Sequence, residues 1–158
     1  MPSTLYWIDT PDSLRLAIMA RPRADDWLED EIAHWRDSGV GIVVSLLEDE
    51  EVEALALQRE AGLCADSGIA FHRFPIPDRG LPDDTGQAVR FAAEIASAGK
   101  PIAIHCRAGI GRSSLMAAAM LVADGMDPVA ALTAIESARG LSIPDTEAQR
   151  AWVLALER

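Results

Sequence analysis

A cysteine and an arginine separated by five residues are the feature of this sequence with the clearest chemical meaning. Cys106 and Arg112 lie in the run His-Cys-Arg-Ala-Gly-Ile-Gly-Arg-Ser, which spans 105–113. A cysteine thiol attacks phosphorus as its thiolate, and positive potential from nearby cations and backbone N–H groups favours that form. An arginine guanidinium is a planar fork of donors that binds two oxygens of a phosphoryl group. The pair therefore predicts covalent phosphoryl transfer through a phosphocysteine.

The residues between Cys106 and Arg112 predict a phosphate-binding loop. Gly109 and Gly111 allow unusual backbone angles and a close approach to phosphoryl oxygens, and a loop that opens a helix aims its N–H groups at an anion. Ser113 follows directly, and its hydroxyl can donate to the sulfur when the thiolate leaves. The side chains expected to line the mouth and contact substrate are those of Arg107, Ala108 and Ile110.

Transfer to a thiolate also requires an acid for the departing oxygen, and an upstream loop supplies carboxylates. The segment 74–84, Phe-Pro-Ile-Pro-Asp-Arg-Gly-Leu-Pro-Asp-Asp, follows a strand-like run and is punctuated by proline and glycine. We expect Asp78 to be the general acid, and then the general base of the second step, because it follows the strand most closely. Asp83 and Asp84 compete for this role, although their position before a helical pattern also suits helix capping.

Strands and helices that alternate along the chain must position these groups. Strand-like runs occupy 5–8, 42–47, 69–76 and 101–106, and helical patterns occupy 24–37, 49–66, 85–98, 113–124, 128–138 and 146–156. This order predicts an α/β fold with a central, mostly parallel sheet flanked by helices. The Cys-x5-Arg loop then lies between a strand and a helix N-terminus. No repeat or linker divides the sequence, so we expect a single domain over 1–158.

Composition restricts the partners of the protein. A net charge of −11 argues against nucleic acid and anionic membrane, which both select basic surfaces. No apolar run has the length of a membrane span, and the start of the sequence lacks a secretory signal pattern, so we expect a cytoplasmic protein. His34 and His72 have no ligand-type residues at metal-binding spacing, so neither a metal nor another cofactor is expected.

Two further features admit a structural interpretation and a functional one. One interpretation of the acidic residues within 49–53 is a partner-binding patch. The favoured interpretation is the solvated start of a helix, where carboxylates interact favourably with the helix dipole. Cys64 is expected to be a small buried hydrophobe, and the alternative is a partner that forms a disulfide with an oxidised Cys106. Two cysteines in this chain fit a reducing compartment better than a disulfide scaffold.

The His-Cys-x5-Arg-Ser run, preceded 28 residues earlier by Asp78, resembles the cysteine-dependent protein tyrosine and dual-specificity phosphatase superfamily. The resemblance extends from about residue 42 to 152, and the aspartate loop is especially similar to that of the kinase-associated phosphatase branch. It implies that Cys106 is the nucleophile, Arg112 the phosphate clamp and Asp78 the acid, with Ser113 as the hydroxyl residue after the arginine. It also matches Gln149 to a glutamine with which some relatives position the hydrolytic water.

The resemblance implies hydrolysis of phosphomonoesters on proteins or small molecules, with phosphotyrosine as a substrate. No aromatic phosphotyrosine-recognition loop is visible, which suggests a shallow pocket that also accepts phosphoserine and phosphothreonine. Phosphoinositide phosphatases of this superfamily carry lysines within the loop, whereas Ala108 and Ile110 are apolar, so highly charged inositol substrates are not expected. Two other functions remain open: a catalytically inactive phospho-binding module and a rhodanese-like sulfur transferase. The intact Cys106, Arg112 and Asp78 argue against the first, and the Asp78 loop against the second.

Overall fold

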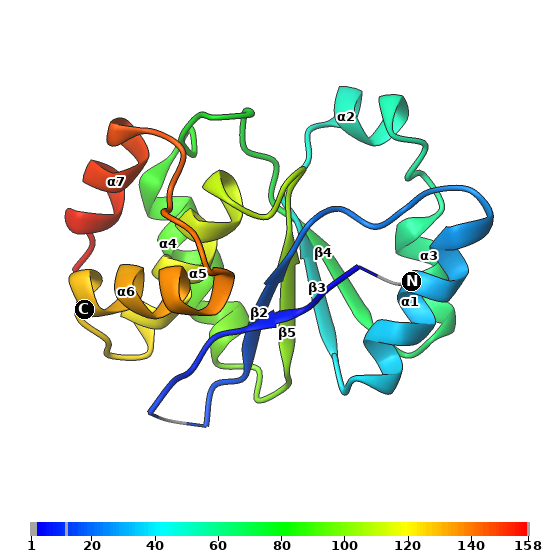
Figure 1. Cartoon of the computed structure of the whole chain (residues 1–158), viewed down its shortest axis with the longest axis horizontal. Coiled ribbons are helices and arrows are strands. Elements are labelled where there is room, and N and C mark those ends of the chain that lie inside the picture. The colour runs from blue at the N-terminus through cyan, green and yellow to red at the C-terminus, as the bar shows by residue number, and fades with distance from the viewer. Residues whose placement is uncertain (1–2, 12, 158) are drawn as a thin grey trace.

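A central sheet organises the fold in a computed structural model that describes residues 3–11 and 13–157. Across these residues the sheet has five strands in the order β1-β2-β5-β3-β4 (Figure 1). The strands are β1 (Tyr6–Trp7), β2 (Leu16–Met19), β3 (Ile42–Ser45), β4 (Ala70–Arg73) and β5 (Ile102–His105). β2, β3, β4 and β5 run parallel, and β1 pairs antiparallel with β2 at one edge. The prediction of a mostly parallel α/β sheet is confirmed.

The three central strands lie in register and end together. His105 at the end of β5 pairs with Met19 on β2 and with Ser45 on β3. Every residue of these strands is buried, because helices cover both faces of the sheet. Since parallel strands share one carboxyl edge, Cys106 emerges between the segments that follow β2 and β3.

Helices form a layer on each side of the sheet (Figure 1). Their bounds are α1 (Asp26–Asp37), α2 (Asp49–Ala54), α3 (Glu60–Asp66), α4 (Thr85–Ala96), α5 (Gly111–Ala123), α6 (Pro128–Arg139) and α7 (Glu147–Leu154). α1 and α3 cover one face, and α4 to α7 gather on the other around α5. α5 is buried over nearly its whole length, and its alanines let the neighbouring helices approach closely. No helix in the described part of the chain is long and apolar enough to cross a membrane.

The structure differs from the sequence-based expectation in two elements. β2 was not expected, because its residues Leu-Ala-Ile-Met include only one β-branched side chain, and pairing with β5 decides its conformation. The helix expected over 49–66 is two helices, α2 and α3, with Ala56 between them at a φ of 55°. After this break, α3 packs against β4 and α1, and its first residue, Glu60, contacts His105 at the end of β5.

Candidate active site

The loop between β5 and α5 is fixed by backbone contacts that only glycine permits. Gly109 has a φ of 73°, and a Cβ there would lie 2.6 Å from the carbonyl oxygen of Met19. The amide of Arg21 donates to the carbonyl of Arg107 over 3.1 Å. The segment after β2 therefore holds the loop in place from one side, which explains why a glycine stands at 109.

Cys106 lies at the base of this loop with its sulfur partly enclosed. The residue is 3% exposed, and the hydroxyl of Ser113 donates to its Sγ over 3.1 Å. Ser113 is itself fully buried on the first turn of α5. The contact expected from the sequence between the serine and the sulfur is therefore present, while the catalytic role of either residue stays a prediction.

Arg112 is held in place by Glu51 from α2. Its Nη1 donates to Glu51 Oε1 over 2.6 Å and its Nη2 to Oε2 over 3.0 Å, while Nη1 also reaches the carbonyl of Ile76 at 3.0 Å. Burial alone would lower the pKa of Arg112, but the Glu51 hydrogen bond and the charges of Cys106, Glu51 and Asp78 raise it above its ordinary value. The guanidinium thus remains charged although it is only 2% exposed.

Glu51 is a site residue that sequence reasoning missed. Burial alone would raise its pKa, but hydrogen bonds from Arg112 and from the Glu48 amide, with the charges of Arg112 and Arg107, lower it. Its side chain also accepts from the backbone of Glu48 as part of a capping box. The acidic run was expected to be a solvated helix start, and it does begin α2. Nothing in its pattern indicated that one carboxylate turns inward to Arg112.

His105 is fully buried on the opposite face of β5 from the core that surrounds α5. Its Nε2 lies 2.6 Å from Glu60 Oε2, and its Nδ1 lies 3.3 Å from the carbonyl oxygen of Cys106. Trp35 packs beside the ring, with centroids 6.3 Å apart. These two contacts and the Trp35 ring fix the orientation of the His105 side chain at the end of β5. Glu60, 45 residues before His105, gave no signal in the sequence.

The structure separates the three candidate acids. Asp78 lines the pocket with Cys106, and its Oδ1 lies 3.3 Å from Arg112 Nη2. Asp84 instead caps α4, because its side chain accepts from the amide of Gln87 over 3.0 Å. Asp83 is exposed and lies outside the pocket lining. A turn closed by a 2.8 Å bond from the Gly80 amide to the Pro77 carbonyl holds Asp78 in its place.

These residues surround a pocket of about 270 Å³. Its lining is formed by Asp78, Arg79, Cys106, Arg107, Ala108, Gly111, Arg112 and Asp145. Gly109 and Ile110 were expected to bind substrate, but neither belongs to this lining. The Ile110 side chain packs against the core beside α5. A cavity of this size with a sulfur and a guanidinium at its base can hold a phosphoryl group and leaves the rest of a substrate outside.

Gln149 is buried and connects two loops of the site. Its Oε1 accepts from the amides of Asp145 and Thr146, at 3.0 and 3.2 Å, and its Nε2 donates to the carbonyl of Gly80 at 3.1 Å. It thereby ties the start of α7 to the loop that carries Asp78. Asp145 occupies the pocket wall instead, next to Gly111. Sequence reasoning missed Asp145, although it lies only four residues before Gln149. The role of Gln149 in positioning water stays a prediction.

The two cysteines lie in different cores. Cys64 is fully buried with Val43 and Ala103 on the face covered by α1 and α3, whereas Cys106 belongs to the core around α5. Burial and the charge of Glu60 raise the pKa of Cys64 to about 12. Both thiols are free. The sheet between these cores favours the interpretation of Cys64 as a buried hydrophobe over a disulfide partner.

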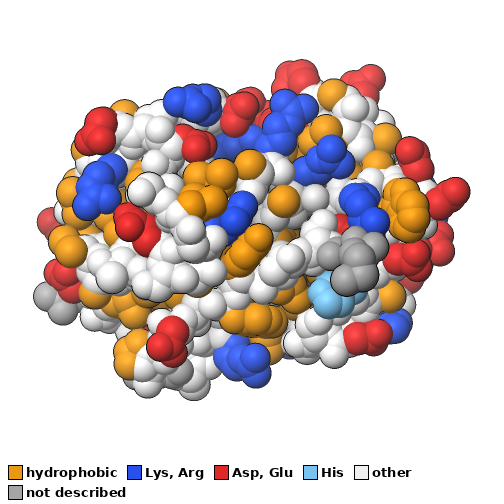
Figure 2. Space-filling model, in the orientation of Figure 1, with side chains coloured by type: hydrophobic (Ala, Val, Ile, Leu, Met, Phe, Trp, Pro, Cys, Tyr) orange, Lys and Arg blue, Asp and Glu red, His pale blue; other side chains and the backbone are white. Residues whose placement is uncertain are grey.

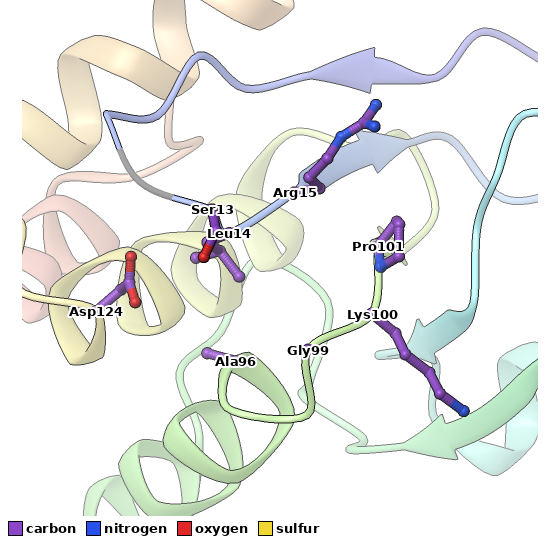
Figure 3. A pocket seen from close by; sticks show the side chains of 8 residues that line it. All are labelled: Ser13, Leu14, Arg15, Ala96, Gly99, Lys100, Pro101 and Asp124. Carbon is purple, nitrogen blue, oxygen red and sulfur yellow. The ribbon is translucent and has the colours of Figure 1, made fainter.

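A second hollow, of about 250 Å³, lies at the opposite end of the strands (Figure 3). It is formed where β2 and β5 begin, and the side chains of Arg15 and Lys100 extend away from it. Without converging cations it lacks the chemistry of a phosphate site. Among the described residues, no group of three or more His, Cys, Asp or Glu side chains could hold a metal ion.

Known proteins share both the sequence pattern and the fold. Residues 17–126 match the family described as "Polymorphic toxin system, DSP-PTPase phosphatase". Cyclin-dependent kinase inhibitor 3 of Rattus norvegicus is 29% identical over 118 residues, which cover 72% of this chain and 55% of that protein. The chain thus spans about half the length of this curated relative.

Solved structures agree with this assignment. Tk-PTP in its active form is 26% identical, with a TM-score of 0.74 over 97% of this chain and 95% of that one. Kinase associated phosphatase is 21% identical and shares the fold, with a TM-score of 0.81 over 97% of this chain and 93% of that one. The family match covers well over half of the sequence, including the whole β5–loop–α5 unit. The chain therefore belongs to the DSP-PTPase phosphatase family of polymorphic toxin systems.

Proposed function

We propose that this chain is a cysteine-dependent phosphatase that hydrolyses phosphomonoesters through a phosphocysteine intermediate, within a single domain over 1–158. The observation that carries the proposal is the convergence of Cys106, Arg112 and Asp78 on one pocket. The sulfur supplies the nucleophile, the guanidinium supplies charge, and the carboxyl group can transfer a proton. The family match supports the same activity.

Arg112 has one edge of its guanidinium left for a phosphoryl group. The side chain carries five N–H hydrogens, of which two bind Glu51 and one binds the carbonyl of Ile76. The remaining two, on Nε and Nη2, form one side of the planar fork. Nη2 also lies 3.3 Å from Asp78 Oδ1. Glu51 therefore sets the orientation of the fork, and a phosphoryl group that binds the free edge releases Asp78 for proton transfer.

In the first step, the Cys106 thiolate attacks phosphorus and the bond to the ester oxygen breaks. Asp78 donates a proton to the departing oxygen, which leaves as an alcohol or phenol. Arg112 and the loop amides bind the equatorial oxygens, and their interaction strengthens as charge accumulates on these oxygens in the transition state. The products of this step are the free alcohol and a phosphocysteine.

In the second step, water attacks the phosphocysteine and the phosphorus–sulfur bond breaks. Asp78, now ionised, accepts a proton from the water, and inorganic phosphate leaves. The Ser113 hydroxyl, 3.1 Å from the sulfur, stabilises the departing thiolate by donating a hydrogen bond. Asp145 lines the same pocket and is a second carboxylate able to orient the water.

The proposed substrates are phosphotyrosine proteins, with phosphoserine, phosphothreonine and small phosphomonoesters as further candidates. The small pocket volume favours a single phosphoryl group over a polyphosphorylated headgroup. The reaction proceeds without metal or cofactor. The acidic net charge supports a function away from nucleic acid and anionic membranes, and two free cysteines support a location in the cytoplasm.

Hydrolysis of para-nitrophenyl phosphate by wild type, Cys106→Ser and Cys64→Ala tests this function. We expect Cys106→Ser to abolish turnover, because serine is a far weaker nucleophile here, and Cys64→Ala to retain it. Acid quench during turnover should trap a phosphate on the Cys106 peptide, detectable by mass spectrometry. Turnover that survives Cys106→Ser would refute the assignment of the nucleophile. A wild type that binds phosphopeptides without hydrolysing them would instead identify a binding module.

A further inference from the structure

Arg139, the last residue of α6, contacts the phosphate loop from outside the pocket. Its Nε donates to the carbonyl oxygen of Gly109 over 3.1 Å, and its Nη2 donates to that of Ala108 over 3.2 Å. Arg139 makes none of the ion pairs found among the described residues. Its positive charge is therefore directed at two successive carbonyl groups of the loop rather than at a carboxylate.

Tyr6 supports the guanidinium of Arg139 on the other side. The centre of the guanidinium lies 4.3 Å from the centroid of the Tyr6 ring, within the range of a cation–π contact. Tyr6 is the only tyrosine of the chain and lies on the edge strand β1, far from the loop in sequence. The ring contact and the two hydrogen bonds to carbonyl groups together leave the guanidinium little freedom to turn.

These two hydrogen bonds determine which way the loop amides point. In a trans peptide the carbonyl and the N–H of one unit point in opposite directions. The Ala108 carbonyl shares its unit with the Gly109 N–H, and the Gly109 carbonyl shares its unit with the Ile110 N–H. When Arg139 holds both carbonyls outward, both N–H groups are turned toward the anion. The φ of 73° at Gly109 is the backbone conformation that allows consecutive amides to converge in this way.

We propose that Arg139 is a positioning residue of the phosphate loop, held by Tyr6, which presents the N–H groups of Gly109 and Ile110 to the phosphoryl group. The proposal rests on the proposed phosphatase function of the same site. The guanidinium also withdraws electron density from both carbonyls and so strengthens the two N–H donors. Ile110 thus contributes to substrate binding through its backbone, although its side chain packs into the core.

Binding of tungstate, an inorganic oxyanion, measures the loop separately from chemistry. Calorimetric titration would compare wild type with Arg139→Ala, Arg139→Lys, Tyr6→Phe and Tyr6→Leu. We expect Arg139→Ala to weaken tungstate binding by roughly tenfold, less than the ~10²–10³-fold typical of removing an oxyanion donor outright. Arg139→Lys keeps the charge but cannot bridge two carbonyls, so it should recover only part of the affinity. Tyr6→Phe keeps the ring and should match wild type, whereas Tyr6→Leu should weaken binding.

Steady-state kinetics with para-nitrophenyl phosphate provide a second readout. Because N–H groups bind the transition state more strongly than the ground state, kcat should fall more than KM rises in Arg139→Ala. Arg150→Ala is the matched control: Arg150 lies on the neighbouring α7 and pairs with Glu136 of α6 at 3.8 Å. It should bind tungstate and turn over substrate as wild type does.

Unchanged tungstate affinity and kcat in Arg139→Ala would overturn the proposal. Equal values for Arg139→Lys and wild type would also overturn it, because charge alone would then suffice. If Arg139→Ala does not fold, as judged by circular dichroism, the Tyr6→Leu and Arg139→Lys variants decide by the same comparison. Wild-type protein that binds tungstate without hydrolysing substrate would refute the phosphatase function and leave the positioning role to be judged by affinity alone.

Discussion

At the scale of single residues, the site is built from charged groups that hold one another in place. Arg112 binds Glu51 and the carbonyl of Ile76, and it also contacts Asp78. An arginine side chain loses conformational entropy when it is held in one rotamer, and the contacts with Glu51 hold Arg112 in that rotamer before substrate binds. In the proposed mechanism, Glu51 therefore orients the Arg112 fork in advance, and substrate displaces Asp78 from it.

The assignment of Asp78 as general acid predicts a dependence on the leaving group. Asp78→Ala should lower kcat for phenyl phosphate by about 10²–10⁴-fold, the usual range for loss of a positioned acid. The loss should be much smaller for para-nitrophenyl phosphate, because its phenolate leaves without a proton. Parallel kinetics with the two esters measure the difference.

Asp84→Ala is the control for this comparison. Asp84 caps α4, so its loss should lower the free energy of unfolding by roughly 0.5–2 kcal/mol and leave both rates intact. A larger kinetic loss in Asp84→Ala or Asp83→Ala than in Asp78→Ala would show that the acid was assigned to the wrong carboxyl group.

At the scale of elements, two connections bring distant segments to the site. The turn between α2 and α3 allows α2 to present Glu51 to Arg112 and α3 to present Glu60 to His105. Gln149, at the start of α7, fixes the loop that carries Asp78 through the carbonyl of Gly80. α2 and α7 thus support residues and loops of the pocket, α3 supports the end of the strand that precedes Cys106, and none of these contacts is local in sequence.

A third connection ties the start of the chain to α1 and makes stability depend on pH. Glu31 on α1 accepts hydrogen bonds from the amide and hydroxyl of Ser3 and from the amide and side chain of Arg23. Burial alone would raise the pKa of Glu31, but these bonds outweigh it and lower the pKa below 4.5. The folded state therefore binds this proton less readily than the unfolded state does.

Because the pKa of Glu31 is lowered in the folded state, Glu31 should stabilise the fold above about pH 4.5. This contribution should disappear as pH falls through the folded pKa. Urea unfolding gives the free energy of unfolding at pH 7 and near pH 4. The decrease between these two pH values should be smaller in Glu31→Gln than in wild type. Glu29→Gln, which removes an exposed carboxylate paired with Arg59, is the control and should retain the wild-type pH dependence. An identical pH dependence in Glu31→Gln would contradict the assignment.

At the scale of the whole molecule, charge is distributed unevenly. The net charge is −11, yet basic side chains gather, with acidic ones among them, in the upper part of the face shown in Figure 2, above the carboxyl ends of the central strands. Arg79 and Arg107 line the pocket and are exposed, and neither makes an ion pair within the described residues. A local positive potential in an acidic protein attracts anionic groups to one place on its surface.

This distribution predicts a preference for acidic residues beside the phosphorylated residue. Phosphotyrosine peptides flanked by Asp and Glu should show a higher kcat/KM than peptides flanked by Lys, and the ratio should shrink from about 0.01 M to about 1 M salt as screening grows. Arg107→Ala should reduce the ratio, whereas Arg36→Ala, which removes an exposed arginine paired with Asp37, should not. A higher kcat/KM for peptides with basic flanks would contradict this prediction and would show that the negative charges of Asp78 and Asp145 determine the potential at the pocket mouth.

The local chemistry of this protein was readable from its sequence. The Cys-x5-Arg spacing, the glycines of the loop and Ser113 are neighbours in the chain, so their proximity follows from covalent connection. The alternation of apolar runs and helical patterns likewise predicted the parallel α/β sheet, because the hydrophobic period reflects which faces are buried. Choosing Asp78 over Asp83 and Asp84 depended on its nearness to a strand, and the structure places only Asp78 of the three in the pocket.

Only the tertiary structure decided which distant side chains meet the loop. Glu51 is 61 residues from Arg112 in the chain, and Glu60 is 45 residues from His105. Arg139 is 30 residues from Gly109, and Asp145 is 34 residues from Gly111. Acidic residues at the start of a helix and an arginine at its end are common on solvated surfaces. Their residue types therefore do not indicate a contact with the loop. Their functions arise from where strand pairing and helix packing place them, and from the desolvation that makes a charge-assisted contact strong at that place.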